Sequence, residues 1–307
     1  MRGFLAALAL LIAAFAVPAT AAGEAKYLVG FAQDDMSNDW RAAQVRAVEK
    51  AFADHPDIGF THTDAGGSTA RNVMDIERLV ERGIDLLMVS PRNKRAMTPA
   101  IARVHRRGIP VVLLTRRIAN DAYTTFIAPD DAAIARRAGN VLARALDGEG
   151  RVLMLKGVPT ATTAVARTRG FKEAIADDPG IRLVASRAAN YKRQDAIRAM
   201  EKVMAEGIAF DAIFAQSDSM AVGARIALRA HDRDPHNVPM VGIDYIRAAR
   251  QAIRDGTQVA SFTYPTCAKP AARIAARILH GEDVPRQVTV ESTMVTKENV
   301  EAVEPIF

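Results

Sequence analysis

The sequence has a single cysteine, Cys267, so no disulfide can form within the chain. A domain without disulfides depends on its apolar core, and 307 residues are enough to build one. The residues around Cys267 match no motif of a catalytic thiol. We therefore expect Cys267 to be a small, buried apolar side chain.

The motifs of common enzyme classes are also missing. The sequence contains no G-x-G-x-x-G, no G-x-x-x-x-G-K-[ST], no G-x-S-x-G and no H-E-x-x-H. Its six histidines do not have metal-ligand spacing, and Asp34, Asp35 and Asp39 lack the full pattern of a calcium loop. We read these three aspartates as a solvated loop. The sequence predicts neither enzymatic activity nor a metal site nor a cofactor.

A concentrated basic surface is missing as well. Lysine and arginine total 41 against 35 aspartate and glutamate, but the excess is scattered over the polar faces of predicted helices. No aromatic residues are interleaved within these short basic clusters, and no nucleic-acid-binding module precedes the domain. We expect solvated surface and no nucleic-acid partner. The residues concerned are Arg92, Lys94, Arg95, Arg103, Arg106, Arg107, Arg136 and Arg137.

Only the first residues form a long apolar run. Arg2 precedes apolar residues 4–17, and the small residues Ala19-Thr20-Ala21 follow. This is the pattern of a secretory signal peptide, and the run is too short to span a bilayer. We expect residues 1–21 to be removed and the mature protein to be soluble in the periplasm.

The remaining chain alternates short apolar strands with amphipathic helices, and the pattern restarts near residue 150. Such alternation predicts an α/β fold with parallel sheets, here as two Rossmann-like lobes. Strands are expected at residues 27–32, 58–63, 86–89, 111–114, 126–128, 151–155, 181–185, 212–215, 239–243, 259–263, 288–290 and 294–296. Helices are expected at residues 40–52, 71–82, 96–107, 164–176, 194–205, 246–255 and 271–279, with two more that begin at Asp130 and Asp218 as N-caps.

Polar side chains follow many of these strands. Ligands bind beyond the carboxyl ends of parallel strands, so this edge predicts a cleft between the lobes. Arginine and carboxylate groups that pair with vicinal hydroxyls, together with aromatic faces, suit a neutral polyhydroxylated ligand. The candidates at strand ends and helix starts include Gln33, Trp40, Arg41, Asp64, Arg116, Tyr191, Ser217 and Asp244.

Each candidate has a simpler structural explanation. Trp40 could pack on the sheet, and Arg116 could form a surface ion pair. Asp64 and Asp218 could be helix caps alone. Arg167 lies early in a helix, where a cation opposes the helix dipole, so we expect an anionic partner or ligand group beside it.

Three motifs resemble the periplasmic sugar-binding proteins of ABC transporters, of the ribose/galactose type. Residues 214–224, F-A-Q-S-D-S-M-A-V-G-A, are similar to that family's F-A-Q-N-D-x-M-A-x-G-A, and residues 241–244 to its V-G-x-D. The opening G-F-A-Q at residues 30–33, with Trp40-Arg41, resembles the galactofuranose-binding branch. The match covers essentially the whole mature chain.

The resemblance implies a type I periplasmic binding protein, with two lobes joined by a three-segment hinge. One lobe would comprise residues 22–129 and about 264–290, the other residues 130–263 and about 291–307. The implied ligand residues are Gln33, Trp40, Arg41, Arg116, Arg167, Tyr191, Ser217 and Asp244. Thr115 and Ser217 stand where the family has aspartate and asparagine, which changes the hydroxyls that can be held and leaves the sugar's identity open.

The family further implies capture of a monosaccharide, a pentose, hexose or furanose, and delivery to an ABC permease at the inner membrane. We expect a monomer. One alternative is an exported sensor that feeds a chemoreceptor or sensor kinase, and a second is a secreted α/β hydrolase. A regulator of the lactose-repressor type would carry an N-terminal helix-turn-helix where this chain has its apolar leader.

Overall fold

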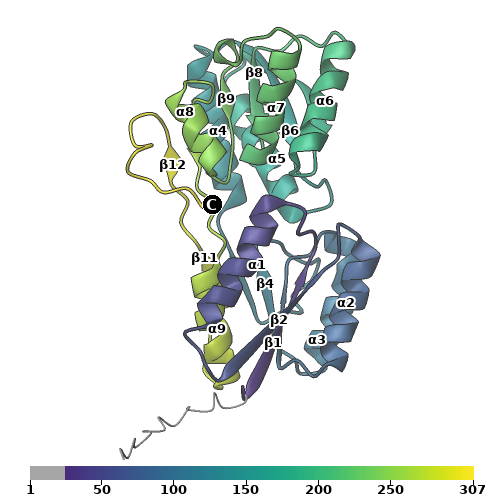
Figure 1. The fold of residues 1–307 in the computed structure, drawn as a ribbon. Coiled ribbons are helices and arrows are strands. Elements are labelled where there is room, and N and C mark those ends of the chain that lie inside the picture. The colour runs from purple at the N-terminus through teal and green to yellow at the C-terminus, as the bar shows by residue number, and fades with distance from the viewer. Residues whose placement is uncertain (1–24) are drawn as a thin grey trace, which may run out of the picture.

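The computed structural model describes residues 25–307 as two α/β lobes stacked end to end (Figure 1). The signal peptide expected at residues 1–21 lies outside the described residues. No helix in the described part of the chain has the length and apolar character needed to cross a membrane.

The first lobe is built on a six-stranded parallel sheet with the order β11-β5-β4-β3-β1-β2. Its central strands are apolar and buried on both faces, as expected for a parallel sheet covered by helices. The strands are β1 (Tyr27–Gln33), β2 (Ile58–Asp64), β3 (Leu86–Val89), β4 (Val111–Leu114), β5 (Thr125–Ala128) and β11 (Gln287–Thr289).

Four helices cover this sheet. Two pack on one face and two on the other, and each pair forms a continuous apolar cluster with the strands. Helices α1, α2 and α3 begin at polar N-caps, Asn38, Ser68 and Asn93. Their side chains accept hydrogen bonds from free backbone amides of the first helical turn. The helices of the first face are α1 (Asp39–Phe52) and α9 (Ala268–Leu279), and those of the second are α2 (Thr69–Glu81) and α3 (Lys94–Arg106).

The second lobe has a four-stranded parallel sheet, β7-β6-β8-β9, and an antiparallel pair, β10 and β12. Helices α4 and α5 cover one face of the larger sheet, and α6 and α7 cover the other. The strands are β6 (Gly150–Lys156), β7 (Ile181–Ala188), β8 (Ala212–Ala215), β9 (Met240–Val241), β10 (Ser261–Phe262) and β12 (Met294–Val295). The helices are α4 (Asp131–Ala145), α5 (Thr162–Ala176), α6 (Arg193–Ala205), α7 (Asp218–Ala230), the short η1 (Pro235–Asn237) and α8 (Arg247–Arg254).

The chain crosses between the lobes three times: from β5 to α4, from β10 to α9, and from β11 to β12. Figure 1 shows α9 and β11, late in the sequence, returning to the lobe that contains the first strands. The predicted α/β fold with two parallel sheets and a three-segment hinge is therefore confirmed.

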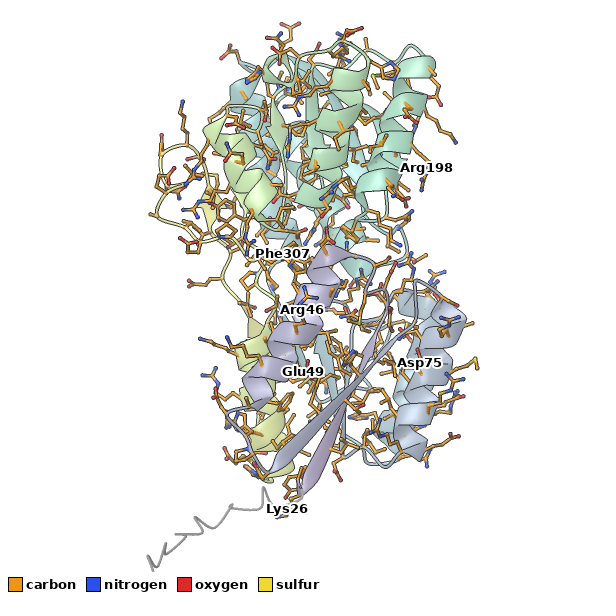
Figure 2. All side chains as sticks on the ribbon, in the orientation of Figure 1. Lys26, Arg46, Glu49, Asp75, Arg198 and Phe307 are labelled. Carbon is orange, nitrogen blue, oxygen red and sulfur yellow. The ribbon has the colours of Figure 1, made fainter. Side chains whose placement is uncertain are left out.

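Most basic side chains on the helices face solvent, as expected; Arg46 of α1 and Arg198 of α6 are examples (Figure 2). Arg92 is an exception because it turns inward. Cys267 is buried, as expected, and burial raises the pKa of its thiol to about 12. One predicted N-cap is wrong. Ser217, not Asp218, caps α7, and Asp218 lies buried in its first turn.

Candidate functional site: a cavity between the lobes

A cavity lies where the carboxyl ends of the two sheets face each other. The first lobe, the second lobe and one crossing segment all contribute to it. Its lining residues are Asp34, Asp35, Asn38, Trp40, Arg41, Arg92 and Arg116 from the first lobe, Val158, Thr163, Arg167, Asn190, Tyr191 and Asp244 from the second, and Tyr264 from the crossing after β10.

Six of the nine candidate residues meet at this cavity. They come from five different strand ends or helix starts, since Trp40 and Arg41 both lie at the start of α1, and the structure brings them together from both lobes. These six are Trp40, Arg41, Arg116, Arg167, Tyr191 and Asp244.

The other three candidates, Gln33, Asp64 and Ser217, do not line the cavity. The Gln33 amide is fully buried, donating to Gln44 and accepting from the backbone of Asp34. Asp64 accepts from the backbone amides of Met36 and Gly66 and so fixes a turn, while Ser217 caps α7. A direct contact of these three with a ligand stays a prediction.

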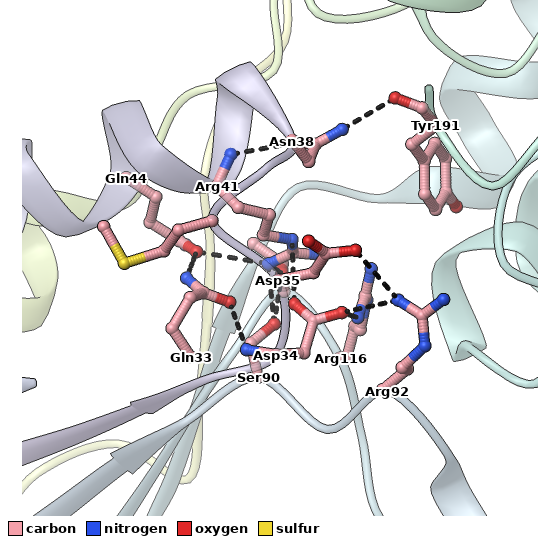
Figure 3. Close-up of polar contacts among 12 residues, drawn as sticks. Gln33, Asp34, Asp35, Asn38, Arg41, Gln44, Ser90, Arg92, Arg116 and Tyr191 are labelled. Atoms are coloured by element: carbon pink, nitrogen blue, oxygen red, sulfur yellow. Dashed lines mark hydrogen bonds and ion pairs between the residues drawn. The ribbon is translucent and has the colours of Figure 1, made fainter. Parts of the chain in front are cut away.

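Asp34 is the centre of an ion-pair cluster on the first lobe (Figure 3). Its carboxylate accepts from the Arg116 guanidinium at 2.7 Å and lies 3.4 Å from that of Arg92 and 3.5 Å from that of Arg41. The expectation of a solvated loop at Asp34 and Asp35 is therefore wrong, because both side chains are buried. Contact with several arginines offsets the cost of removing these carboxylates from water.

Charge pairing decides the protonation of this cluster. Burial alone would raise the pKa of Asp34, but Arg116, Arg41 and Arg92 outweigh it and the pKa is lowered. Burial and the neighbouring Arg116 lower the pKa of Arg41 to about 10. Both groups therefore stay charged at neutral pH.

Arg41 also links the start of α1 to two strand ends of the first lobe. One guanidinium nitrogen donates to Ser90 at 2.7 Å, Gln44 at 3.1 Å and Thr115 at 3.2 Å. Thr115 has a left-handed backbone with φ of 62°, which is costly for a β-branched residue. The strand ends β3 and β4 are thus tied to the start of α1.

The second lobe presents Arg167 and Tyr191 to the cavity. Arg167 donates to the carboxylate of Asp131 at 2.7 Å and to the backbone carbonyl of Gln216. The anionic partner expected beside Arg167 is thus Asp131, which also accepts from the Tyr264 hydroxyl at 3.2 Å. The Tyr191 hydroxyl hydrogen-bonds to Thr163 at 2.9 Å.

Tyr191 fits only because residue 157 is a glycine. A Cβ at Gly157 would lie 1.8 Å from the Tyr191 ring. The guanidinium groups of Arg116 and Arg167 lie 5.9 and 5.7 Å from the centre of the same ring. Tyr191 thus lies between an arginine of each lobe, which favours cation–π contact.

Asp244 differs from the other charged groups of the cavity. No hydrogen bond or ion pair joins its carboxylate to another of residues 25–307, although it is only 6% exposed. Burial raises its pKa well above the usual range, and Arg167 offsets this only in part. A buried carboxylate without a partner is costly unless a ligand supplies donors.

Trp40 both packs and lines the cavity. Its indole nitrogen donates to the backbone carbonyl of Tyr264 at 2.9 Å, and the two rings are 5.4 Å apart in a tilted arrangement. The Arg41 guanidinium lies 5.0 Å from the Trp40 ring. Trp40 therefore packs against Tyr264 and also lines the cavity, while a stacking contact with a ligand stays a prediction.

Direct contacts join the lobes at the edge of the cavity. The Asn38 amide donates to the backbone carbonyl of Tyr191 at 2.7 Å (Figure 3), and Lys192 lies 2.8 Å from the Asp35 carboxylate. Thr160 donates to the backbone carbonyl of Arg92 at 3.0 Å. Because these contacts need the facing ends of the two lobes to be close together, the structure is a closed conformation.

Residues 29–283 match the periplasmic binding protein domain family, which is most of the chain. The chain belongs to this family. A ribose import binding protein of Haemophilus influenzae is 30% identical over 236 residues, covering 76% of this chain and 80% of the relative. The expected resemblance to type I periplasmic sugar-binding proteins is confirmed.

Solved structures of other periplasmic binding proteins have the same fold as this chain. The fructose-binding periplasmic domain of a hybrid two-component system has a TM-score of 0.86 and 27% identity, covering 90% of this chain and 92% of that one. A galactofuranose-binding protein has a TM-score of 0.85 at 24% identity, covering 90% and 96%, which shows the fold alone.

Several cavity residues of this periplasmic binding protein were not among the candidates. Asp34 and Asp35 directly follow β1, so their position at a strand end was a usable signal. Arg92 was taken for surface because its local pattern is polar. Asn190 also follows a strand, β7. No local pattern marked the remaining residues, Asn38, Val158, Thr163 and Tyr264.

Proposed function

We propose that this protein is a periplasmic solute-binding protein that captures a monosaccharide between its lobes and delivers it to an ABC importer. The observation that carries the proposal is the unpartnered carboxylate of Asp244, which lies in the same cavity as the Asp34–Arg116 pair of the opposite lobe. A ligand that donates to Asp244 and also contacts the first lobe would favour the closed form.

The chemistry of the cavity suits hydroxyl groups. Arg116 and Arg167 are already paired with carboxylates, so neither is a free cation for an anionic ligand. Hydroxyls can accept from the remaining guanidinium N–H groups and donate to Asp244. The rings of Trp40, Tyr191 and Tyr264 supply apolar faces for the C–H side of a sugar.

The partners follow from the same proposal. We infer a periplasmic location after loss of residues 1–21, an inner-membrane permease as partner, and a monomeric state. We divide the mature chain into one lobe of residues 22–129 and about 264–290, and a second of residues 130–263 and about 291–307. We infer that the sugar is bound without turnover.

A thermal-shift screen tests the proposal. Pentoses, hexoses, furanoses and polyols would be added singly to the mature protein, with sugar acids as negative controls. A ligand at about a hundred times its Kd stabilises the folded state by roughly 2.7 kcal/mol, which is easily seen as a raised unfolding midpoint. No shift with any neutral sugar or polyol would contradict the proposal.

A sensory role is the second candidate. It is favoured by the similarity to the fructose-binding periplasmic domain of a two-component system. Deletion of the gene separates the two roles. Loss of uptake of the bound sugar supports the importer, whereas intact uptake with lost sugar-dependent gene expression or chemotaxis supports the sensor.

A further inference from the structure

Asp218 is a fully buried carboxylate behind the cavity that makes no direct ion pair with any other of residues 25–307. One of its oxygens accepts from the backbone amide of Tyr245 at 2.7 Å and from the Ser261 hydroxyl at 2.6 Å. The other accepts from the Gln258 amide at 2.7 Å. Three donors from two different segments therefore converge on one side chain.

The segment that Asp218 holds is strained. Asp244 and Tyr245 have φ of 115° and 55°, in the region that non-glycine residues rarely adopt. Such a conformation persists only where the surroundings impose it. The backbone amide that follows Asp244 is the one bonded to Asp218, so the strain and the hydrogen bond coincide.

The Asp218 carboxylate occupies the space beside Gly242 that a larger side chain would fill. A Cβ at Gly242 would lie 1.8 Å from an Asp218 oxygen, so any larger residue there would displace it. Gln258 is fixed in turn by Arg225, whose guanidinium donates to the side-chain amide oxygen of Gln258 at 2.7 Å. Arg225 therefore makes no direct hydrogen bond to Asp218, although its charge lowers the pKa of that carboxyl.

We propose that Asp218 is a positioning residue: through the amide of Tyr245 it sets the backbone that aims the Asp244 carboxylate into the cavity. This role rests on the proposed function of the cavity. Asp218 itself does not line the cavity, so it acts on a ligand only through Asp244.

The energetic cost of Asp218 supports a functional role. Burial raises its pKa to about 6, despite the hydrogen bonds from Ser261, Gln258 and Tyr245. The charged groups that face it are Arg225 and Asp244. Because the folded pKa lies above the unfolded value, its stabilising contribution is lost as pH rises from about 4 through 6. At neutral pH the carboxylate therefore costs stability.

A double-mutant cycle tests the role in binding. The probe is D-ribose, or whichever sugar of the panel raises the unfolding midpoint most. We expect Asp218→Asn to lower its affinity at least tenfold in the wild-type background and to have little effect in an Asp244→Asn background. Equal losses in both backgrounds would show a general structural effect and overturn the proposal.

A matched control separates this from the loss of any buried carboxylate. Asp75→Asn removes a carboxylate of α2 that is buried and does not line the cavity, and it should leave affinity unchanged. If Asp218→Asn does not fold, Ser261→Ala replaces it, since it removes one of the three donors without changing the charge.

A ligand-free measurement separates failure of this inference from failure of the proposed function. Crystal structures of the unliganded Asp218→Asn or Ser261→Ala variant should show residues 244–245 in a changed backbone conformation, with the Asp244 carboxylate turned from its wild-type direction. An unmoved Asp244 would overturn the inference whatever sugar binds. A moved Asp244 in a protein that binds no sugar would overturn only the proposed function.

Discussion

Asp34 supplies Arg116 with a carboxylate partner from 82 positions earlier in the chain, at 2.7 Å. The residue that precedes Arg116 is Thr115. Its hydroxyl contacts Arg41 and Ser90 and does not pair with Arg116. Because Asp34 also faces Arg41 and Arg92, one carboxylate holds three cations of the cavity in place.

We predict that Asp34→Asn destabilises the protein strongly. Removal of one partner from a buried ion pair leaves uncompensated charge, which costs about 3–5 kcal/mol. The free energy of unfolding in urea measures this effect. Asp211→Asn is the matched control, since Asp211 pairs with Arg151 at 2.8 Å but is over a third exposed, and such pairs contribute about 0–1 kcal/mol. Equal losses in the two variants would contradict a dominant role of Asp34.

Binding of a monosaccharide should change the fluorescence of Trp40. It is the only tryptophan in the chain, it lines the cavity, and it lies against Tyr264 and Arg41. A ligand at this position alters the polarity around the indole, so emission should shift or be quenched. Binding detected by calorimetry with unchanged emission would show that Trp40 serves packing alone.

Asp244→Asn should stabilise the unliganded protein at neutral pH. Burial raises the folded pKa of Asp244 above its unfolded value, so its contribution to stability is present at low pH and lost as pH rises through the folded pKa. The variant's advantage in thermal unfolding should therefore be clear at pH 7 and shrink towards pH 4. Glu201→Gln, at an exposed position of α6, is the control. An advantage that does not vary with pH would contradict the assignment.

Gly157→Ala should weaken sugar binding. The added Cβ would meet the Tyr191 ring at 1.8 Å, so the ring must move and its hydrogen bond to Thr163 must break. Gly59→Ala is the control, because its Cβ would meet its neighbours at ordinary contact distances of 3.4–3.5 Å in β2, away from the cavity. Calorimetry should show lower affinity for the first variant only. Wild-type affinity in Gly157→Ala would mean that Tyr191 does not contact the ligand.

The sequence was informative where parallel strands end. Strand, polar residue and helix recur along the chain, and the carboxyl ends of parallel strands share one edge, so residues such as Arg116 and Asp244 could be placed together. The same local pattern led to a wrong N-cap prediction for α7. Ser217 and Asp218 are both good N-caps, and only the positions of Tyr245, Gln258 and Ser261 decide that Asp218 turns inward.

Pairing across long sequence separations could not be predicted. Asp34, Asp35 and Arg92 looked solvated because their neighbours in sequence are polar. The approach of β1, β3 and the second lobe nevertheless buries both aspartates and leaves the Arg92 side chain only 18% exposed. Burial of a charge depends on its partner, and neither sequence distance nor local polarity identifies that partner. Six of nine candidate residues therefore reached the cavity, while the charges that hold them were missed.

Isothermal titration calorimetry of Arg116→Ala and Asp244→Ala tests the central claim, a sugar held between both lobes. The probe is the sugar that most raises the unfolding midpoint in the screen. Each variant should lose about 1–3 kcal/mol of binding free energy, roughly fivefold to 150-fold in Kd, because a hydrogen-bond partner is removed from a buried site. Wild-type affinity in both variants would contradict the account and place the binding site elsewhere.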